Sequence, residues 1–146
     1  MGLLAVVALG LAGVVGQAVE PPLVDLPRKV LALTGGSPRE CGRFQLREAA
    51  APLEGATRNE LGAAVRCARQ AMRDGQPFWT FNQRRGIDSW VAHGLLRTSS
   101  GALHYFVYDA SPCGGPNCQP TLSLEPCRDV GVRPATDGEP VDFTCR

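Results

Sequence analysis

The stretch TRNELGAAVRCARQAMRDGQPFWTFNQ, residues 57–83, decides the fold, because the spacing of its apolar residues changes partway along it. In its first part apolar residues recur every three or four positions, which places them on one side of an α-helix. These residues are Leu61, Val65, Ala68 and Met72. Thr57 and Glu60 form a capping box before them, and Asp74-Gly75 supplies a stop. We therefore predict a helix over residues 58–73.

Beyond this helix the apolar spacing becomes two, which is typical of β-strands. The pattern predicts four strands, over residues 77–83, 87–97, 102–109 and 121–125. Short turns join the first three strands, and strands joined in this way form an antiparallel meander. The fold class that we predict is therefore α+β, with one N-terminal amphipathic helix packed across a four-stranded antiparallel meander.

This outline resembles the architecture of cystatin-like and similar small exported domains. Cystatins carry a Q-x-V-x-G hairpin, and the turn here reads QRRG at residues 83–86, without the valine and one residue shorter. The resemblance concerns the architecture alone, and no inhibitor residue is assigned from it.

The first eighteen residues, MGLLAVVALGLAGVVGQA, have the pattern of a secretory signal peptide, although no Lys or Arg precedes the apolar run. Gly16 and Ala18 provide the small side chains expected before a cleavage site. The run is shorter than the roughly 18 to 20 apolar residues that a membrane-spanning helix needs, which disfavours an uncleaved anchor. We expect cleavage after Ala18, and a secreted or periplasmic mature chain that does not contact the membrane.

The mature chain is predicted to have an arm and one domain. Residues 19–40 contain four prolines and a Gly-Gly pair, which predicts a mostly irregular arm. Residues 28–33 could form a turn of helix or a short strand within it. Residues 41–146 have the length of a single domain, which ends in an irregular tail from residue 128 onward because the apolar pattern fades there.

Six cysteines remain in the mature chain, and an even number in a small exported protein predicts a disulfide framework. Our working pairing is Cys41–Cys67, Cys113–Cys118 and Cys127–Cys145, in which the Gly114-Gly115-Pro116 bend closes the middle loop. The sequence alone does not choose among the possible pairings. The alternatives are a zinc site and a redox pair. Both are disfavoured, because no histidine lies near a cysteine and the spacing within YDASPCGGPNCQ is not C-x-x-C.

Composition narrows the set of partners. The net charge is +1 at pH 7, which gives no electrostatic reason to expect nucleic acid or an anionic membrane. No phosphate-binding loop, dinucleotide fingerprint or H-E-x-x-H motif occurs, so we expect no cofactor and no metal. Lys29 is the only lysine among many arginines, which is typical of a GC-rich, bacterial genome. We expect a monomer.

The two histidines fall in neighbouring predicted strands. If the loop between these strands is Ser99-Ser100-Gly101, His93 lies opposite Val107, and His93 and His104 point to different faces of the sheet. A loop one residue shorter would place them on the same face. In either case they are not directly opposite, so a shared histidine site is disfavoured.

Other catalytic candidates are few. Asp88 and Asp109 lie at strand ends, where an acid pair could form, although aspartates there are more often turn or cap residues. Ser89 does not lie in a nucleophile elbow. Catalysis is therefore less favoured than binding.

Aromatic residues concentrate in three of the predicted strands. If the helix covers one face of the sheet, aromatic side chains on the other face lie exposed beside arginines, which is typical of a protein-binding surface. The binding surface that we predict consists of Trp79, Arg84, Arg85, Trp90 and Tyr108. The alternative is that the tails and the disulfide loop cover this face.

Three functions are compatible with these observations. The leading hypothesis is an exported, non-catalytic binding module whose partner is an unknown protein or small ligand. The second is an exported hydrolase or enzyme inhibitor, and the third is a structural envelope protein without a site. The first is favoured because the cysteines indicate a disulfide framework, whereas no catalytic motif is recognisable.

Overall fold

The computed structural model describes residues 25–45, 56–86, 89–115, 117–136 and 141–146. In chain order the elements are α1 (Leu26–Thr34), β1 (Arg39–Gln45), α2 (Ala56–Arg73), β2 (Phe78–Arg85), β3 (Trp90–Arg97), β4 (Leu103–Asp109), β5 (Thr121–Pro126), β6 (Val130–Arg133) and β7 (Asp142–Cys145). The predicted signal peptide, residues 1–18, lies outside the described residues. Within the described part, no helix has the length and apolarity to cross a membrane.

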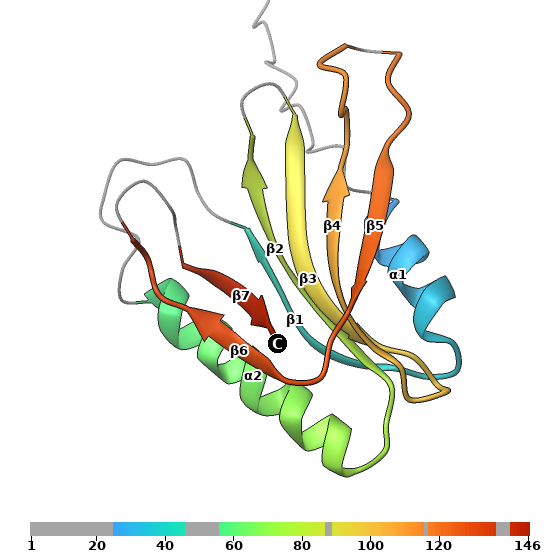
Figure 1. The fold of residues 1–146 in the computed structure, drawn as a ribbon, viewed down its shortest axis with the longest axis vertical. Helices are drawn as coiled ribbons and strands as arrows, with labels where there is room; N and C mark the ends of the chain where they lie inside the picture. Colours follow the sequence, from blue (N-terminus) through green and yellow to red (C-terminus); the bar gives the residue numbers. More distant parts are fainter. Residues whose placement is uncertain (1–24, 46–55, 87–88, 116, 137–140) are drawn as a thin grey trace, which may run out of the picture.

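Five strands form one sheet in the order β1-β2-β3-β4-β5, and β6 and β7 form a separate hairpin (Figure 1). The neighbours from β2 to β5 pair antiparallel, whereas β1 runs parallel to β2. The predicted α+β class with a mostly antiparallel sheet is confirmed. The predicted count of four strands is wrong, because β1 adds a fifth strand through a crossover connection that contains α2.

β1 was not recognised because its residues, RECGRFQ, show no regular alternation of apolar side chains. Its register against β2 shifts between Glu40 and Arg43, which marks a bulge. Gly42 lies in this bulge with φ at 129°, and a Cβ there would overlap the ring of Phe44. The guanidinium of Arg43 lies over the ring of Trp79, 4.8 Å from its centroid. A polar segment therefore joins the sheet as an edge strand.

α2 covers one face of the sheet, as predicted. Of the predicted stripe, Leu61, Val65 and Ala68 are buried and Met72 is half-buried. They pack with sheet residues that include Phe78, Leu95 and Leu103. The helix begins at Ala56, earlier than expected, so Thr57 lies in its first turn.

The opposite face is covered by α1, which has a proline in its first turn. The buried residues on that side include Leu26, Val30, Trp79, Phe106 and Tyr108. The ammonium of Lys29 lies 5.3 Å from the centroid of the Tyr108 ring. The structure therefore differs from the mostly irregular arm expected over residues 19–40, because residues 26–34 are a helix that completes a second core.

The end of the chain also differs from the irregular tail that we expected. β6 and β7 pair antiparallel from Val130↔Cys145 to Arg133↔Asp142. Val130 and Phe143 are buried in the core on the α2 side. Each strand has four residues, too few for a period-two pattern to be recognised in the sequence.

The three disulfides have the predicted pairing. Cys41–Cys67 joins β1 to α2, Cys113–Cys118 closes the loop between β4 and β5, and Cys127–Cys145 ties the hairpin to the end of β5. Their Cα–Cα distances are 5.5, 5.7 and 5.5 Å, within the usual range for disulfides. YDASPCGGPNCQ is therefore a loop closed by a disulfide bond.

Candidate functional site

Four polar side chains converge between the sheet and the C-terminal hairpin, and we call them the polar cluster. They are Arg84 on β2, His93 on β3, Tyr105 on β4 and Asp142 on β7. The side chain of Asp142 is 1% exposed, that of His93 14% and that of Arg84 27%. A carboxylate buried to this degree needs positive charge and hydrogen-bond donors around it. The cluster therefore joins the hairpin to three strands of the sheet through charge.

The contacts of His93 define how the cluster is hydrogen-bonded. Nη2 of Arg84 lies 3.1 Å from Nε2 of His93, and the hydroxyl of Tyr105 lies 2.9 Å from Nδ1. A guanidinium can only donate, and Nη2 is closer to Nε2 than to Nδ1, which lies 3.5 Å away; we therefore assign the acceptor role to Nε2 and the ring proton to Nδ1, beside Tyr105 and Asp142. The hydroxyl oxygen of Tyr105 accepts the hydrogen bond from this N–H, which leaves the hydroxyl proton for another acceptor.

Asp142 is held mainly by charge. Its Oδ1 accepts a hydrogen bond of 2.8 Å from the backbone N–H of Phe143. Its Oδ2 lies 2.7 Å from Nδ1 of His93 and 3.5 Å from Nη1 of Arg84, yet neither contact has the alignment of a hydrogen bond. Across the strand from His93, both polar atoms of the Asn82 side chain are buried without a hydrogen-bond partner. The site therefore holds buried hydrogen-bonding capacity that protein groups do not use.

Tyr105 remains a neutral phenol over the physiological range. Burial, and after it the carboxylate of Asp142, raises the pKa of Tyr105 to about 12. A phenol that keeps its proton serves as a hydrogen-bond donor and does not act as a base.

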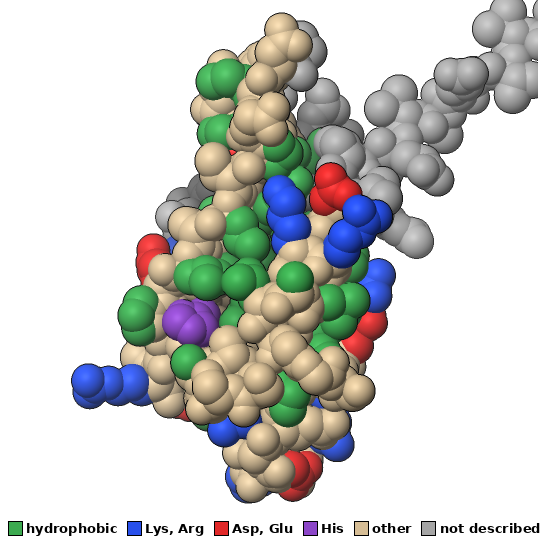
Figure 2. All heavy atoms as spheres, turned by 90° about the vertical axis from the view of Figure 1, so that its right-hand side faces the viewer, with side chains coloured by type: hydrophobic (Ala, Val, Ile, Leu, Met, Phe, Trp, Pro, Cys, Tyr) green, Lys and Arg blue, Asp and Glu red, His purple; other side chains and the backbone are tan. Residues whose placement is uncertain are grey.

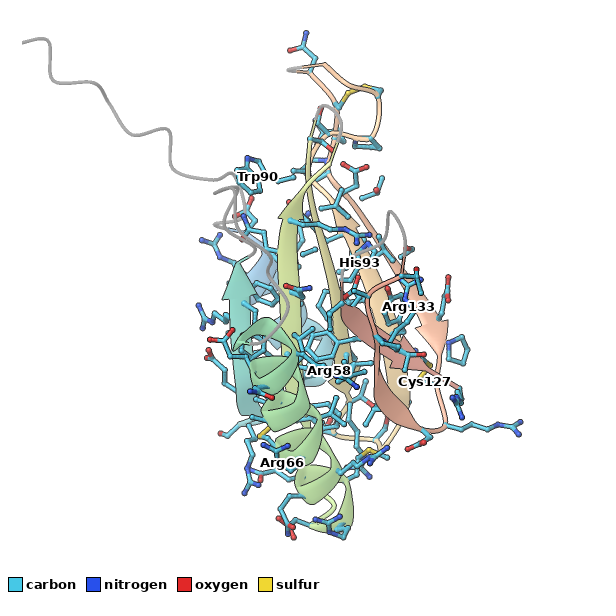
Figure 3. The ribbon with its side chains drawn as sticks, turned by 90° about the vertical axis from the view of Figure 1, so that its left-hand side faces the viewer. Arg58, Arg66, Trp90, His93, Cys127 and Arg133 are labelled. Atoms are coloured by element: carbon cyan, nitrogen blue, oxygen red, sulfur yellow. A yellow bond between two sulfur atoms is a disulfide. The ribbon has the colours of Figure 1, made fainter. Side chains whose placement is uncertain are left out.

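An open, shallow depression of about 240 Å³ lies beside the cluster. Its lining residues are Tyr105, Glu125, Arg133, Phe143, Thr144 and Cys145. Tyr105 therefore belongs both to the buried cluster and to the wall of the depression. Figure 3 shows His93 and Arg133 on the same side of the molecule, on the sheet and on the hairpin. The lining of this depression includes a carboxylate (Glu125), a guanidinium (Arg133), a phenol (Tyr105) and a hydroxyl (Thr144).

The structure separates the residues of the predicted binding surface. Trp79 and Tyr108 are each 1% exposed, because α1 covers them. Trp90 is half-buried near one end of the sheet, apart from His93 in Figure 3. Arg84 belongs to the polar cluster on the other face, and the side chain of Arg85 lies outside the described part. Of the two alternatives for the aromatic face, the structure therefore shows the covered one.

The histidines lie as the longer loop predicted. His93 pairs with Val107, and the N–H of Thr98 donates to the carbonyl of Ala102. His93 therefore faces the hairpin while His104 points to the opposite side of the sheet. A site shared by both histidines is not formed.

The other catalytic candidates are engaged in local structure. The carboxylate of Asp109 accepts hydrogen bonds from the hydroxyl of Ser89, at 2.8 Å, and from the N–H of Ser111, at 2.9 Å. This is the turn role expected of an aspartate at a strand end. Asp88 lies outside the described residues. Among the residues that are described, no group of three or more metal-binding side chains occurs.

Sequence reasoning missed Tyr105, Arg133 and Asp142 as site residues, because Arg133 and Asp142 fall in the stretch expected to be irregular. The signal that could have found them is Cys145, whose pairing with Cys127 requires the end of the chain to fold back toward the sheet. Against known proteins, no family model, no curated protein and no solved structure matches this chain.

Proposed function

We propose that the protein is an exported, non-catalytic binding module, and that its partner is a protein that inserts a single side chain into the depression beside Tyr105. The observation that carries the proposal is the junction of the depression with the polar cluster at the Tyr105 hydroxyl. The phenol has a proton to donate. Near it, Oδ2 of Asp142 and the side-chain amide of Asn82, which lies next to the cluster, are buried without hydrogen bonds. A ligand group that satisfies such atoms gains specificity.

The size of the depression favours a side chain over a small-molecule ligand. Its volume of about 240 Å³ is below the roughly 300 to 1,000 Å³ of typical small-molecule sites. Pockets that receive one anchoring side chain are a common feature of protein–protein interfaces. Glu125 and Arg133 on its wall would select the polarity of that side chain.

Three features support binding over hydrolysis. Tyr105 keeps its proton because its pKa is raised to about 12, and His93 is held between Arg84 and Asp142. The hydroxyl of Ser89, which would be a candidate nucleophile, donates a hydrogen bond to Asp109. The resemblance to cystatin-like domains stays a prediction about architecture, and it implies no inhibitory role.

Export is the second part of the proposal. Three disulfides are typical of proteins that fold in an oxidising compartment, and the leader sequence predicts passage to the periplasm or the medium. Intact mass of the exported protein tests this. We expect a chain that begins at Val19, with no thiol alkylated before reduction and all six alkylated after it. Residues before Val19 in the mature protein, or alkylation of Cys113 and Cys118 without reduction, would contradict export and the disulfide framework respectively.

The binding site is tested with peptides as defined probes. A displayed library of random linear peptides is selected on the oxidised wild-type protein and counter-selected on the Glu125→Lys variant. We expect enriched peptides that bind the wild type and lose roughly tenfold or more in affinity on Glu125→Lys, the size of one interface contact. In ¹⁵N-edited spectra these peptides should shift the amide signals of Tyr105, Arg133 and Thr144.

Glu60→Lys is the matched control, because it makes the same charge reversal at an exposed position on α2. It should leave peptide binding unchanged. The proposal fails if no peptide is enriched, or if the enriched peptides bind Glu125→Lys as well as they bind the Glu60→Lys control.

A further inference from the structure

β5 is an edge strand of the described sheet. It is last in the strand order, and none of the described strands pairs with its outer edge. Most of its residues are exposed, including Leu124 at 38%. Figure 2 looks onto this side of the molecule, where hydrophobic side chains (green) lie among the tan atoms of the backbone and of other side chains. Such an edge carries unpaired backbone N–H and C=O groups that can pair with another strand.

The hydrogen bonds to β4 show which groups of β5 are free. The N–H of Cys127 donates to the carbonyl of Leu103 at 2.9 Å, in the register that continues along both strands. In an antiparallel pair, successive residues direct their backbone groups alternately toward and away from the neighbouring strand. The residues of β5 that direct them away are therefore Leu122, Leu124 and Pro126.

Prolines limit what this edge can pair with. Pro126, and Pro120 in the same phase just before the strand, have no N–H to donate. The free donors along this edge are therefore the N–H groups of Leu122 and Leu124. The proline spacing limits the edge to a short ladder, which disfavours open-ended association with further strands.

A second copy of β5 matches this short ladder. When two copies run antiparallel about a two-fold axis at Ser123, Leu122 lies opposite Leu124 of the second copy, and each leucine both donates and accepts a backbone bond. Pro120 then lies opposite Pro126, so no donor is left unpaired there. An axis at either leucine would instead place the other leucine opposite a proline and lose bonds.

Side chains fit the same register. Leu122 packs against the core on the α1 side, and the exposed Leu124 would be covered by Leu122 of the second copy. Glu125 would lie opposite Thr121, so no like charges meet across the axis.

We propose that the protein forms a homodimer by antiparallel pairing of β5 with β5 of a second copy, which joins the two sheets into one. This inference differs from the monomer expected from composition and does not depend on the proposed function. It has a consequence for the depression, because Thr121 of the second copy would lie beside Glu125 at its rim.

Site-directed disulfide formation tests the register. Ser123 lies on the axis as a pair without backbone hydrogen bonds, where Cα atoms are about 4.5 Å apart and a disulfide can form. All six native cysteines are paired, so Ser123→Cys adds the one free thiol of the oxidised chain. We expect rapid oxidation to a covalent dimer. Thr121→Cys is the control, because its equivalents would be about 13 Å apart, and it should cross-link only slowly.

Leu124→Pro provides an independent variant. It removes an outward N–H, so the fold tolerates it while the ladder loses its donor. Sedimentation velocity should show a dimer for the wild type and a monomer for Leu124→Pro at the same concentration. The proposal is overturned if the wild type sediments as a monomer at high concentration, or if Ser123→Cys cross-links no faster than Thr121→Cys.

Discussion

At the scale of single residues, the buried carboxylate of Asp142 should stabilise the fold. Asp142→Ala leaves Arg84 and His93 facing each other without the buried carboxylate that holds them. We expect a loss of about 3 kcal/mol in the free energy of unfolding, as for other broken buried ion pairs, measured by urea denaturation of the oxidised protein. Asp129→Ala is the matched control, because its ion pair with Arg69 is exposed and should contribute about 1 kcal/mol or less. Equal losses in the two variants would contradict a structural role for the cluster.

Gly94 is a position where the sheet requires the absence of a side chain. A Cβ there would overlap the ring of Phe106 and the backbone oxygen of Thr80, and the backbone oxygen cannot move away. Gly94→Ala should therefore cost about 2 to 3 kcal/mol of stability. Gly62→Ala on α2 should instead gain about 0.5 to 1 kcal/mol, because its Cβ makes ordinary contact with Arg66 in a helix. Thermal unfolding of both variants checks the opposite signs.

Tyr105 gives the fold a dependence on alkaline pH. Because its folded pKa is raised from 10.0 to about 12, the folded state holds the phenolic proton more tightly than the unfolded state. The resulting stability is complete below pH 10 and is lost as the pH rises toward 12. Unfolding free energies measured across this window should fall less in Tyr105→Phe than in the wild type. A parallel fall in both proteins would show that other groups control the alkaline transition.

At the scale of elements, the disulfides differ in the chain that they close. Cys127–Cys145 spans 18 positions and ties the β6–β7 hairpin, whereas Cys113–Cys118 spans 5 within one loop. By loop entropy, replacing both cysteines of the first pair with serine should cost about 3 kcal/mol, and of the second about 2 kcal/mol. Urea unfolding of the two double variants measures the difference. A larger loss at Cys113–Cys118 would mean that the loop supports more of the fold than its length indicates.

The elements predicted from the sequence are those whose apolar pattern repeats over a long enough stretch. α2 and the strands β2 to β5 were found because their apolar residues repeat over enough positions to distinguish a spacing of about 3.6 from one of 2. β1 was missed because a bulge at Gly42 interrupts its alternation. β6 and β7 were missed because each is four residues long and depends on its partner and on α2 for burial.

The candidate site was predictable only in part. The register that turns His93 away from His104 follows from the length of one hairpin loop; the sequence left two lengths open, and the structure forms the longer one. Asp142 and Arg133 reach the sheet through a hairpin that folds back over it, and no local pattern reports such a long-range contact. Trp79 and Tyr108 have the composition of a binding surface, but α1 buries them, and a sequence pattern does not show which segment covers a face.

At the scale of the whole molecule, the two ends of the described chain pack on opposite faces of the same central strands. α1 contacts β2 and β3 on one face, and β7 approaches β3 and β4 on the other. The three central strands are thus buried between segments that are distant from each other in the sequence.

This arrangement implies an order of events during folding. Neither α1 nor β7 has a surface to pack on until β2, β3 and β4 have paired. Helix α1 is synthesised before these strands, so it can pack only after residues that follow it in the chain have folded. Until then Trp79, Phe106 and Leu26 remain open to solvent and to holdase chaperones. In pulsed hydrogen exchange we expect amides of the central strands to gain protection before those of α1, and the reverse order would contradict this sequence. The packing of α1 on the sheet would then be the last step of folding. After it, the face that contains Trp79 and Phe106 is no longer accessible to other chains.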